Sequence, residues 1–204
     1  MIGAVFPAAG EGKRMGSLKQ LLPWEKDRTL AQVSLENLLE SKEIDGPVRV
    51  VLGAGAERIE RKIKKISDRR IQIRFNPDYQ EGLLSSIRTG LRDLPRETEA
   101  FFVALADQPF IPGKIYDVLA RTFREEKASI IVPVYRGKRG HPVLFSTCFL
   151  PEIERLPIQS EGLKILLNRY PGKIRVCTVM EEGIIRDIDY PADYKRFRED
   201  KNEK

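Results

Sequence analysis

The order of the expected elements predicts an α/β domain with a mainly parallel sheet and helices on both of its faces. Short apolar runs alternate with amphipathic segments along the chain, which is typical of β-α-β units. The run AFFVALA at 100–106 is wholly apolar, as expected of a central strand covered on both faces. No linker, repeat or low-complexity stretch divides the chain, so we expect a single domain over residues 1–198 and a charged tail over 199–204.

Local patterns predict the individual elements. Thr29 and Gln32 fit the S/T-x-x-E/Q capping box, which satisfies free N–H groups at a helix start. After residue 134 the alternation loosens: 135–145 is interpreted as a loop leading into a strand, and 183–191 as a strand-like run into a turn. The other strands are expected at 2–6, 48–53, 71–75, 100–106, 128–134 and 173–179, and the helices at 29–40, within 57–70, at 83–94, from Pro112 onward, at 161–170 and at 192–200.

The charge balance allows an anionic ligand without requiring one. The net charge is +6, from 36 Lys and Arg against 30 Asp and Glu. The densest basic run, 57–70, has Ile59, Ile63 and Ile66 at helical spacing, so its cations should face solvent. That run contains no aromatic residue for base stacking, which argues against an RNA-binding protein, and we expect no nucleic-acid partner.

The composition favours a cytoplasmic protein without membrane contact. No apolar run approaches the roughly 20 residues of a membrane span. Residues 1–6 lack the basic and long apolar regions of a signal peptide, so we expect no secretory signal. Cys148 and Cys177 lie far apart in apolar sequence and form no C-x-x-C motif, so we expect two buried thiols.

The segment after the first expected strand, FPAAGEGKRMGSLKQLLPW at 6–24, matches neither common nucleotide-binding pattern. The dinucleotide fingerprint needs glycine where Met15 stands. The P-loop needs glycine in place of Pro7 and Ser or Thr in place of Arg14. What remains is a glycine-rich turn that carries several cations.

This turn nevertheless has the parts of a phosphate-binding loop. Glycines at 10, 12 and 16 allow backbone N–H groups to approach a phosphate, and Lys13, Arg14 and Lys19 supply positive charge. In open parallel sheets, ligands bind beyond the carboxyl ends of the strands, where this segment lies. We expect phosphate binding here, with Lys13 as the most solvated of the three cations; a solvated loop is the alternative.

Two acidic segments are candidates for a metal site. Asp107 follows the most apolar expected strand and should lie at its carboxyl end, where one carboxylate can hold Mg²⁺ together with water and phosphate oxygens. Asp187 and Asp189 are two residues apart, so an extended backbone would place both on one face. The alternatives are a turn cap for Asp107 and a structural role for the second segment, with Asp193 capping the last helix.

Together these stretches resemble the signature of the nucleotidyltransferases that load a nucleotide onto the molybdenum cofactor, within the MobA-like NTP transferase superfamily. The cytidylyltransferase branch is the most similar. The matching segments are PAAGEGKRMGSLKQLLPW, NPDYQEGLLSSIRTGL, LADQP, RGHPVLF and DIDYPADY, in family order from Pro7 to Tyr194. The resemblance implies a Rossmann-like three-layer α/β/α fold of the nucleotide-diphospho-sugar transferase type.

The resemblance also implies the reaction and the residues that perform it. CMP would pass from CTP to the phosphate of the molybdopterin cofactor, with Mg²⁺ as cofactor, pyrophosphate as product, and a molybdoenzyme or its chaperone as a protein partner. Arg14, Lys19 and Asp107 are the expected catalytic residues. The nucleotide-binding set is Ala8, Ala9, Gly10, Gly12, Arg14, Lys19, Gly82, Ser86 and Asp107, and the acceptor-binding set is Gly140, His141 and Pro142. The metal ligands are Asp107 and one aspartate of the DID segment, for which Asp189 is preferred and Asp187 is the open alternative.

The implied chemistry needs little acid–base catalysis. The acceptor phosphate is already anionic at neutral pH, so positioning and charge neutralisation suffice. This suits a chain with one histidine, His141, which is expected to contact the pterin or phosphate rather than to remove a proton. A packed turn histidine is the alternative.

One segment departs from the family pattern. Where the family usually carries D-x-G-A-R, this chain has SEGLK, with Ser160, Leu163 and Lys164 in place of Asp, Ala and Arg. Lysine and arginine are not equivalent at a phosphate or a pterin. Two alternatives therefore stay open: a nucleotidyltransferase that uses GTP or another acceptor, such as a sugar or alcohol phosphate, and a non-catalytic nucleotide-binding module.

Overall fold

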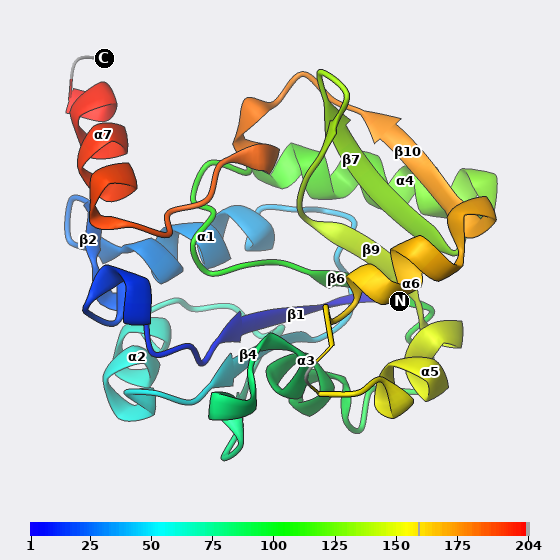
Figure 1. The fold of residues 1–204 in the computed structure, drawn as a ribbon, viewed down its shortest axis with the longest axis horizontal. Coiled ribbons are helices and arrows are strands. Elements are labelled where there is room, and N and C mark those ends of the chain that lie inside the picture. The colour runs from blue at the N-terminus through cyan, green and yellow to red at the C-terminus, as the bar shows by residue number, and fades with distance from the viewer. Residues whose placement is uncertain (159, 203–204) are drawn as a thin grey trace.

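The middle layer of the protein is an eight-stranded sheet, seen in a computed structural model that describes residues 1–158 and 160–202 (Figure 1). Its strands run in the order β10-β7-β9-β6-β1-β4-β5, and β8 pairs with β7. Strands β5, β4, β1 and β6 are mutually parallel, while β9 is antiparallel to both β6 and β7, so the prediction of a mainly parallel sheet is confirmed. The bounds are β1 Ile2–Ala8, β4 Val48–Leu52, β5 Ile71–Phe75, β6 Ala100–Val103, β7 Ile130–Tyr135, β8 Lys138–Arg139, β9 Val143–Ser146 and β10 Ile174–Thr178.

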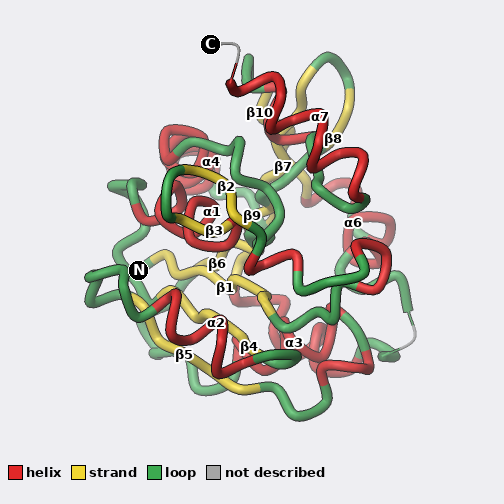
Figure 2. Tube along the Cα trace, turned by 90° about the vertical axis from the view of Figure 1, so that its left-hand side faces the viewer, coloured by secondary structure: helices red, strands yellow, loops and turns green. Residues whose placement is uncertain are grey.

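Helices cover both faces of this sheet. On one face lie α1 (Leu30–Leu39), α2 (Ala56–Ile63) and α4 (Gly113–Glu126), and on the other α3 (Leu83–Leu91), α5 (Leu150–Arg155) and α6 (Lys164–Arg169). Successive strand side chains point to opposite faces, so Phe102 of β6 joins the first core and Phe101 joins the second. Helix α7 (Pro191–Asn202) packs beside a hairpin of β2 (Pro23–Glu25) and β3 (Arg28–Thr29) (Figure 2).

Several local predictions are confirmed. The capping box at the start of α1 is present: the backbone N–H of Gln32 donates to Thr29 Oγ1 at 3.4 Å, and the backbone N–H of Thr29 donates to Gln32 Oε1 at 3.0 Å. Ile59 and Ile63 of the basic segment are buried against the sheet. At the start of α7, Asp193 Oδ2 accepts from the backbone N–H of Tyr190 at 2.9 Å, which is a cap.

Three expectations are wrong. The segment 183–191 forms no strand: it begins within the 3₁₀ helix η6 (Glu182–Ile185), and its backbone hydrogen-bonds to the loops at His141 and Asp107 instead of to a neighbouring strand. Strand β6 ends at Val103 rather than at 106, because its pairing with β1 and β9 stops there and the chain turns towards Asp107. Cys148 is exposed rather than buried, since the neighbouring Phe149 takes the core position; Cys177 is half-buried and both thiols are free.

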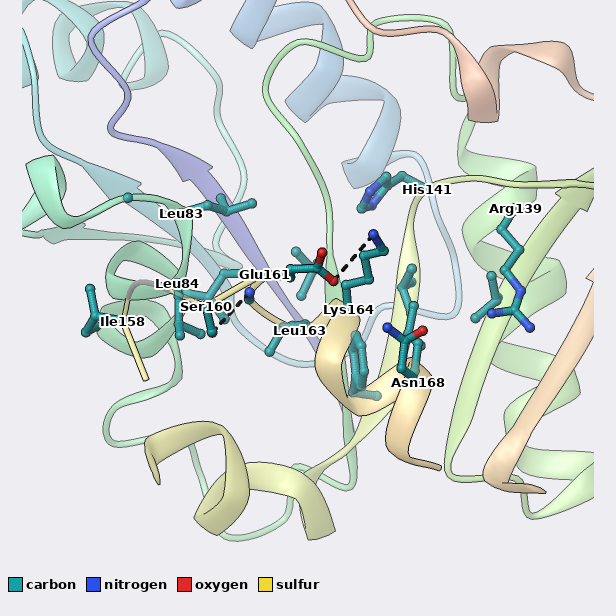
Figure 3. A pocket seen from close by; sticks show the side chains of 18 of the residues that line it. Leu83, Leu84, Arg139, His141, Ile158, Ser160, Glu161, Leu163, Lys164 and Asn168 are labelled. Carbon is teal, nitrogen blue, oxygen red and sulfur yellow. Dashed lines mark hydrogen bonds and ion pairs between the residues drawn. The ribbon is translucent and has the colours of Figure 1, made fainter. Parts of the chain in front are cut away.

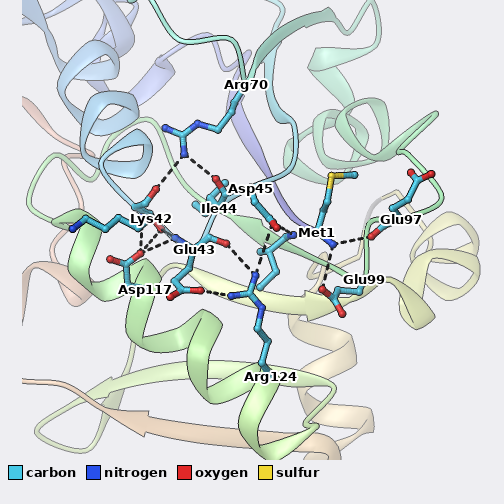
Figure 4. A network of polar contacts seen from close by, with 12 residues as sticks. Met1, Lys42, Glu43, Ile44, Asp45, Arg70, Glu97, Glu99, Asp117 and Arg124 are labelled. Atoms are coloured by element: carbon cyan, nitrogen blue, oxygen red, sulfur yellow. Dashed lines mark hydrogen bonds and ion pairs between the residues drawn. The ribbon is translucent and has the colours of Figure 1, made fainter.

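A network of polar contacts holds the amino ends of the central strands (Figure 4). Asp117 of α4 accepts hydrogen bonds through Oδ1 from the Ser41 hydroxyl at 2.6 Å and from the backbone N–H groups of Lys42 and Glu43 at 2.9 and 3.1 Å. Asp45 of the same loop accepts from the Ile2 N–H of β1 at 2.6 Å. These hydrogen bonds tie α4, the loop that contains Ser41 to Asp45 and the amino end of β1 together.

The end of the chain continues as helix beyond the expected domain boundary. Helix α7 extends to Asn202, so the backbone of residues 199–202 is helical, whereas Glu203 and Lys204 of the expected tail lie outside the described residues. Across 1–158 and 160–202, no helix combines the length and the apolar character needed to cross a membrane.

Candidate active site

The loop after β1 is held in place by a buried glutamine. The side-chain amide of Gln20 donates to the carbonyl oxygen of Gly10 at 2.9 Å and to that of Ala8 at 3.3 Å. Gly12 has φ +66°, and a Cβ there would approach the Ser17 carbonyl carbon to 3.0 Å, so this glycine shapes the turn. The loop presents its cations from two short 3₁₀ helices, η1 (Lys13–Met15) and η2 (Lys19–Leu21).

Two cations of this loop bind two distant carboxylates. Lys19 Nζ contacts Asp107 Oδ2 and lies 3.0 Å from Asp189 Oδ1. Arg14 Nη1 lies 2.8 Å from the other oxygen of Asp189. Asp107 comes from the loop after β6 and Asp189 from the loop before α7, so the fold brings three separate segments together at the carboxyl end of the sheet. Lys13 instead pairs with Glu11 at 2.9 Å and is 81% exposed.

Burial and charge act against each other in this cluster. Burial raises the pKa of Asp107 above its usual value, although the Lys19 ammonium opposes this. Burial opposes ionisation of Asp189 too, but Lys19 and Arg14 outweigh it and hold the pKa of this carboxyl below its usual value. Burial disfavours the charged form of Lys19, and the two carboxylates overcome that effect and raise its pKa. Lys19 is therefore an ammonium at neutral pH.

The residues of this cluster fit a divalent cation. Asp107 Oδ1 is buried and has no hydrogen-bond partner among the described residues, so this carboxylate has an oxygen available for a further positive charge. Within 1–158 and 160–202 there is no group of three or more His, Cys, Asp or Glu side chains placed to hold a metal. Mg²⁺ is commonly bound by one or two carboxylates, with water and substrate phosphates completing its coordination. Asp107 and Asp189 would be those ligands.

A cavity of about 390 Å³ lies over this cluster. Of the residues predicted from the sequence to bind nucleotide or metal, it is lined by Ala9, Gly10, Arg14, Lys19, Gly82, Ser86, Asp107 and Asp189. Ala8, the last residue of β1, is not among the lining residues, and Gly12 lines a different cavity beside Lys13. The structure also separates the two acidic residues of the 187–189 segment, because Asp187 accepts a hydrogen bond from Gln108 and only Asp189 contacts Lys19.

Sequence reasoning missed two buried amides that position this cavity. Gln20 holds the loop after β1, and Asn76 holds the start of α3 by donating to the hydroxyls of Ser85 and Ser86 at 2.9 and 3.1 Å. Both residues lie inside matched motifs, but one polar residue at a loop position gives no sign that its side chain is buried. Their burial follows from the surrounding segments, which only the folded chain brings together.

Figure 3 shows a second cavity, of about 650 Å³. Gly82 and Leu83 line both cavities, so the two adjoin. The polar rim of the second cavity includes Lys164, which pairs with Glu161 at 3.4 Å, and its wall is largely aliphatic. The predicted acceptor residues Gly140 and His141 line it, whereas Pro142 is buried next to it. The segment that differs from the family pattern, SEGLK at 160–164, also lines this cavity through Ser160, Leu163 and Lys164.

Gly140 and His141 are fixed by the η6 turn. A Cβ on Gly140 would lie 2.7 Å from the Ile184 carbonyl carbon, so only glycine fits without displacement of the backbone. The His141 N–H donates to the Ile184 carbonyl oxygen at 2.9 Å. Burial lowers the pKa of the His141 imidazole although Asp187 and Asp107 oppose this, so the ring is neutral at pH 7. Its Nδ1 is buried and has no hydrogen-bond partner in the described part of the chain.

Comparison with known proteins identifies relatives along nearly the whole chain. Residues 4–174 match the sequence model of the MobA-like NTP transferase domain. The chain is 29% identical over 199 residues to molybdenum cofactor cytidylyltransferase of Escherichia coli K12, covering 97% of this chain and 96% of that protein. It is 32% identical over 190 residues to a probable molybdenum cofactor guanylyltransferase of Methanosarcina acetivorans, covering 91% of this chain and 80% of that protein.

A solved structure is similar to this protein in fold along nearly its whole length. The Mycobacterium sp. strain JC1 homologue of Mycobacterium tuberculosis Rv0371c superposes with a TM-score of 0.82 at 26% identity. The match covers 98% of this chain and 96% of that one, and it confirms the predicted fold type.

Proposed function

Since the chain belongs to the MobA-like NTP transferase family and is a nucleotidyltransferase, we propose that it transfers CMP from CTP to the phosphate of the molybdenum (molybdopterin) cofactor, with Mg²⁺ bound and pyrophosphate released. The observation that carries this proposal is the contact of Lys19 with both Asp107 and Asp189 in the lining of a cavity that Arg14 also lines. This cluster combines cations for a triphosphate with carboxylates for a divalent metal.

The proposed roles follow from position. Gly10, Gly82 and Ser86 line the cavity. In this proposal the backbone at Gly10 contacts the nucleotide, and Gly82 and Ser86 border the base. Arg14 and Lys19 neutralise the triphosphate, and as charge develops on the leaving pyrophosphate they stabilise it. Asp107 and Asp189 would hold Mg²⁺, which when bound supplies positive charge to the phosphate oxygens.

The bond changes need no protein base. An anionic oxygen of the acceptor phosphate forms a new bond to the α-phosphorus, and the bond from that phosphorus to the bridging oxygen of the β-phosphate breaks. Pyrophosphate leaves with the electron pair, and no proton has to be removed from the nucleophile. A neutral His141 at the wall of the second cavity is consistent with a role in contacting the acceptor rather than in proton transfer.

The adjoining cavity is the proposed acceptor site. It shares Gly82 and Leu83 with the nucleotide cavity, so in this proposal an acceptor held there directs its phosphate towards the α-phosphorus. CTP is preferred in this proposal because the cytidylyltransferase relative aligns over nearly the full length of both chains, whereas the guanylyltransferase relative aligns over 80% of its own length. GTP is the competing donor.

The experiment that tests this function supplies purified enzyme with molybdopterin cofactor released from a molybdoenzyme, and with α-labelled CTP or GTP. Labelled dinucleotide cofactor and pyrophosphate should form faster with CTP. Faster reaction with GTP would reassign the base, and turnover only with a sugar phosphate or an alcohol phosphate would reassign the acceptor. Nucleotide binding without pyrophosphate release from any combination would refute catalysis and favour a binding module.

A further inference from the structure

We propose that Lys19 couples metal binding to nucleotide binding by holding the two carboxylates that a divalent cation would use. This inference rests on the proposed metal–nucleotide function of the site. It concerns how strongly the affinity for metal depends on bound nucleotide, beyond the charge that Lys19 supplies to the triphosphate.

The contacts of the two carboxylates carry the argument. Lys19 Nζ contacts one oxygen of Asp107 and one of Asp189, and Arg14 contacts the second oxygen of Asp189. The remaining oxygen, Asp107 Oδ1, is buried without a hydrogen-bond partner among the described residues. A divalent cation held by Asp107 and Asp189 would share these carboxylates with the Lys19 ammonium, which lies against one oxygen of each. Lys19 therefore opposes the binding of metal by itself.

A nucleotide triphosphate removes this opposition. Its oxygens enter the cavity that Arg14 and Lys19 line, and they offer both cations alternative anionic acceptors. Lysine suits the exchange because its compact ammonium sits on a flexible four-carbon stem. When Lys19 turns to the phosphates, Asp107 and Asp189 become available to the metal. Nucleotide thus raises metal affinity through Lys19, in addition to the direct coordination of metal by phosphate, and metal raises nucleotide affinity by the same factor.

Titration with Mn²⁺, followed by electron paramagnetic resonance of the free ion, tests this coupling without turnover. In the absence of nucleotide, Lys19→Met should bind Mn²⁺ about tenfold or more tightly than the parent protein, because the competing ammonium is gone. Saturating CTP, after subtraction of the Mn²⁺ that the same CTP binds without protein, should then raise the Mn²⁺ affinity of the parent protein by a larger factor than that of the variant. Lys13→Met is the matched control: it removes a lysine from the same loop, but this lysine is 81% exposed and pairs with Glu11, so Mn²⁺ affinity should not change.

The outcomes separate this inference from the function on which it rests. If Asp107→Asn binds Mn²⁺ as well as the parent protein does when both are saturated with CTP, the metal site is elsewhere and the proposed metal–nucleotide function fails. If Asp107→Asn loses binding but Lys19→Met binds no more tightly than the parent protein, the coupling role is wrong and the proposed function stands. Circular dichroism checks folding, and Lys19→Gln provides the same comparison should the methionine variant unfold.

Discussion

Replacing Asp107 with asparagine should abolish most activity, because the change keeps the shape of the side chain and removes its charge. Two unit charges about 4 Å apart interact by about 4 kcal/mol at an effective dielectric constant of about 20, which corresponds to about 10³-fold in rate. Asp107 is buried, and the cost of desolvating its charge raises its pKa. This cost offsets part of the favourable interaction between the two charges. We therefore expect kcat/KM for CTP to fall about 10²- to 10³-fold.

The same substitution should not weaken the fold. The pKa of Asp107 is raised in the folded protein, so the stability linked to this group is present below the unfolded pKa and is lost as the pH rises through the folded pKa. A neutral asparagine avoids that loss, so Tm at pH 7 should be equal or higher. Asp117→Asn is the matched control: Asp117 accepts three hydrogen bonds at the opposite end of the sheet, so Tm should fall while kcat/KM is kept.

Pyrophosphate release with CTP and thermal unfolding of the three proteins at pH 7 provide the measurements. A kcat/KM of Asp107→Asn within about tenfold of the parent enzyme would refute the charge argument. A loss of Tm as large as that of Asp117→Asn would refute the assignment of Asp107 to function rather than to stability.

Three further substitutions test the neighbourhood of the site. Gln20→Met removes both hydrogen bonds to the loop after β1, so the unfolding free energy measured with urea should fall by about 1–3 kcal/mol and KM for CTP should rise; unchanged values of both would contradict a positioning role. Lys164→Arg restores the family's arginine at the rim of the second cavity, so KM for the molybdopterin acceptor should fall about threefold or more while KM for CTP is kept; an equal change in both would contradict its placement. Burial lowers the pKa of His141 from 6.5, so the stability linked to its neutral form is present above the unfolded pKa and is lost as the pH falls through the folded pKa. Lowering the pH from about 7 to about 5 should therefore reduce the Tm of the parent protein more than that of His141→Gln, and parallel Tm curves would contradict this.

Local sequence patterns determined most of the architecture. Alternating apolar and amphipathic runs predicted the parallel sheet and its helices, because strand and helix periodicities follow from backbone geometry within a few residues. The Thr29–Gln32 capping box was predictable for the same reason, since both of its hydrogen bonds span one helical turn. The position of Asp107 after the most apolar strand was sufficient to place it at the carboxyl end of the sheet.

The wrong predictions concern segments whose conformation or burial depends on which other residues pack beside them. The run 183–191 has the alternation of a strand, yet its backbone bonds to the loops at His141 and Asp107, and no local pattern indicates that these loops lie beside it. Cys148 lies in apolar sequence, but only one side chain of the η4 turn (Thr147–Phe149) can fill the core, and Phe149 does so.

Tertiary structure alone decided how the site is assembled. The sequence by itself indicated that Lys19, Asp107 and Asp189 belong to one site, but their contacts join residues 88 and 170 positions apart. The choice of Asp189 over Asp187 as the partner of Lys19 depends on Gln108 binding the other carboxylate. Such pairings depend on how loops from different strands pack at one edge of the sheet, and no periodicity within the chain encodes that packing.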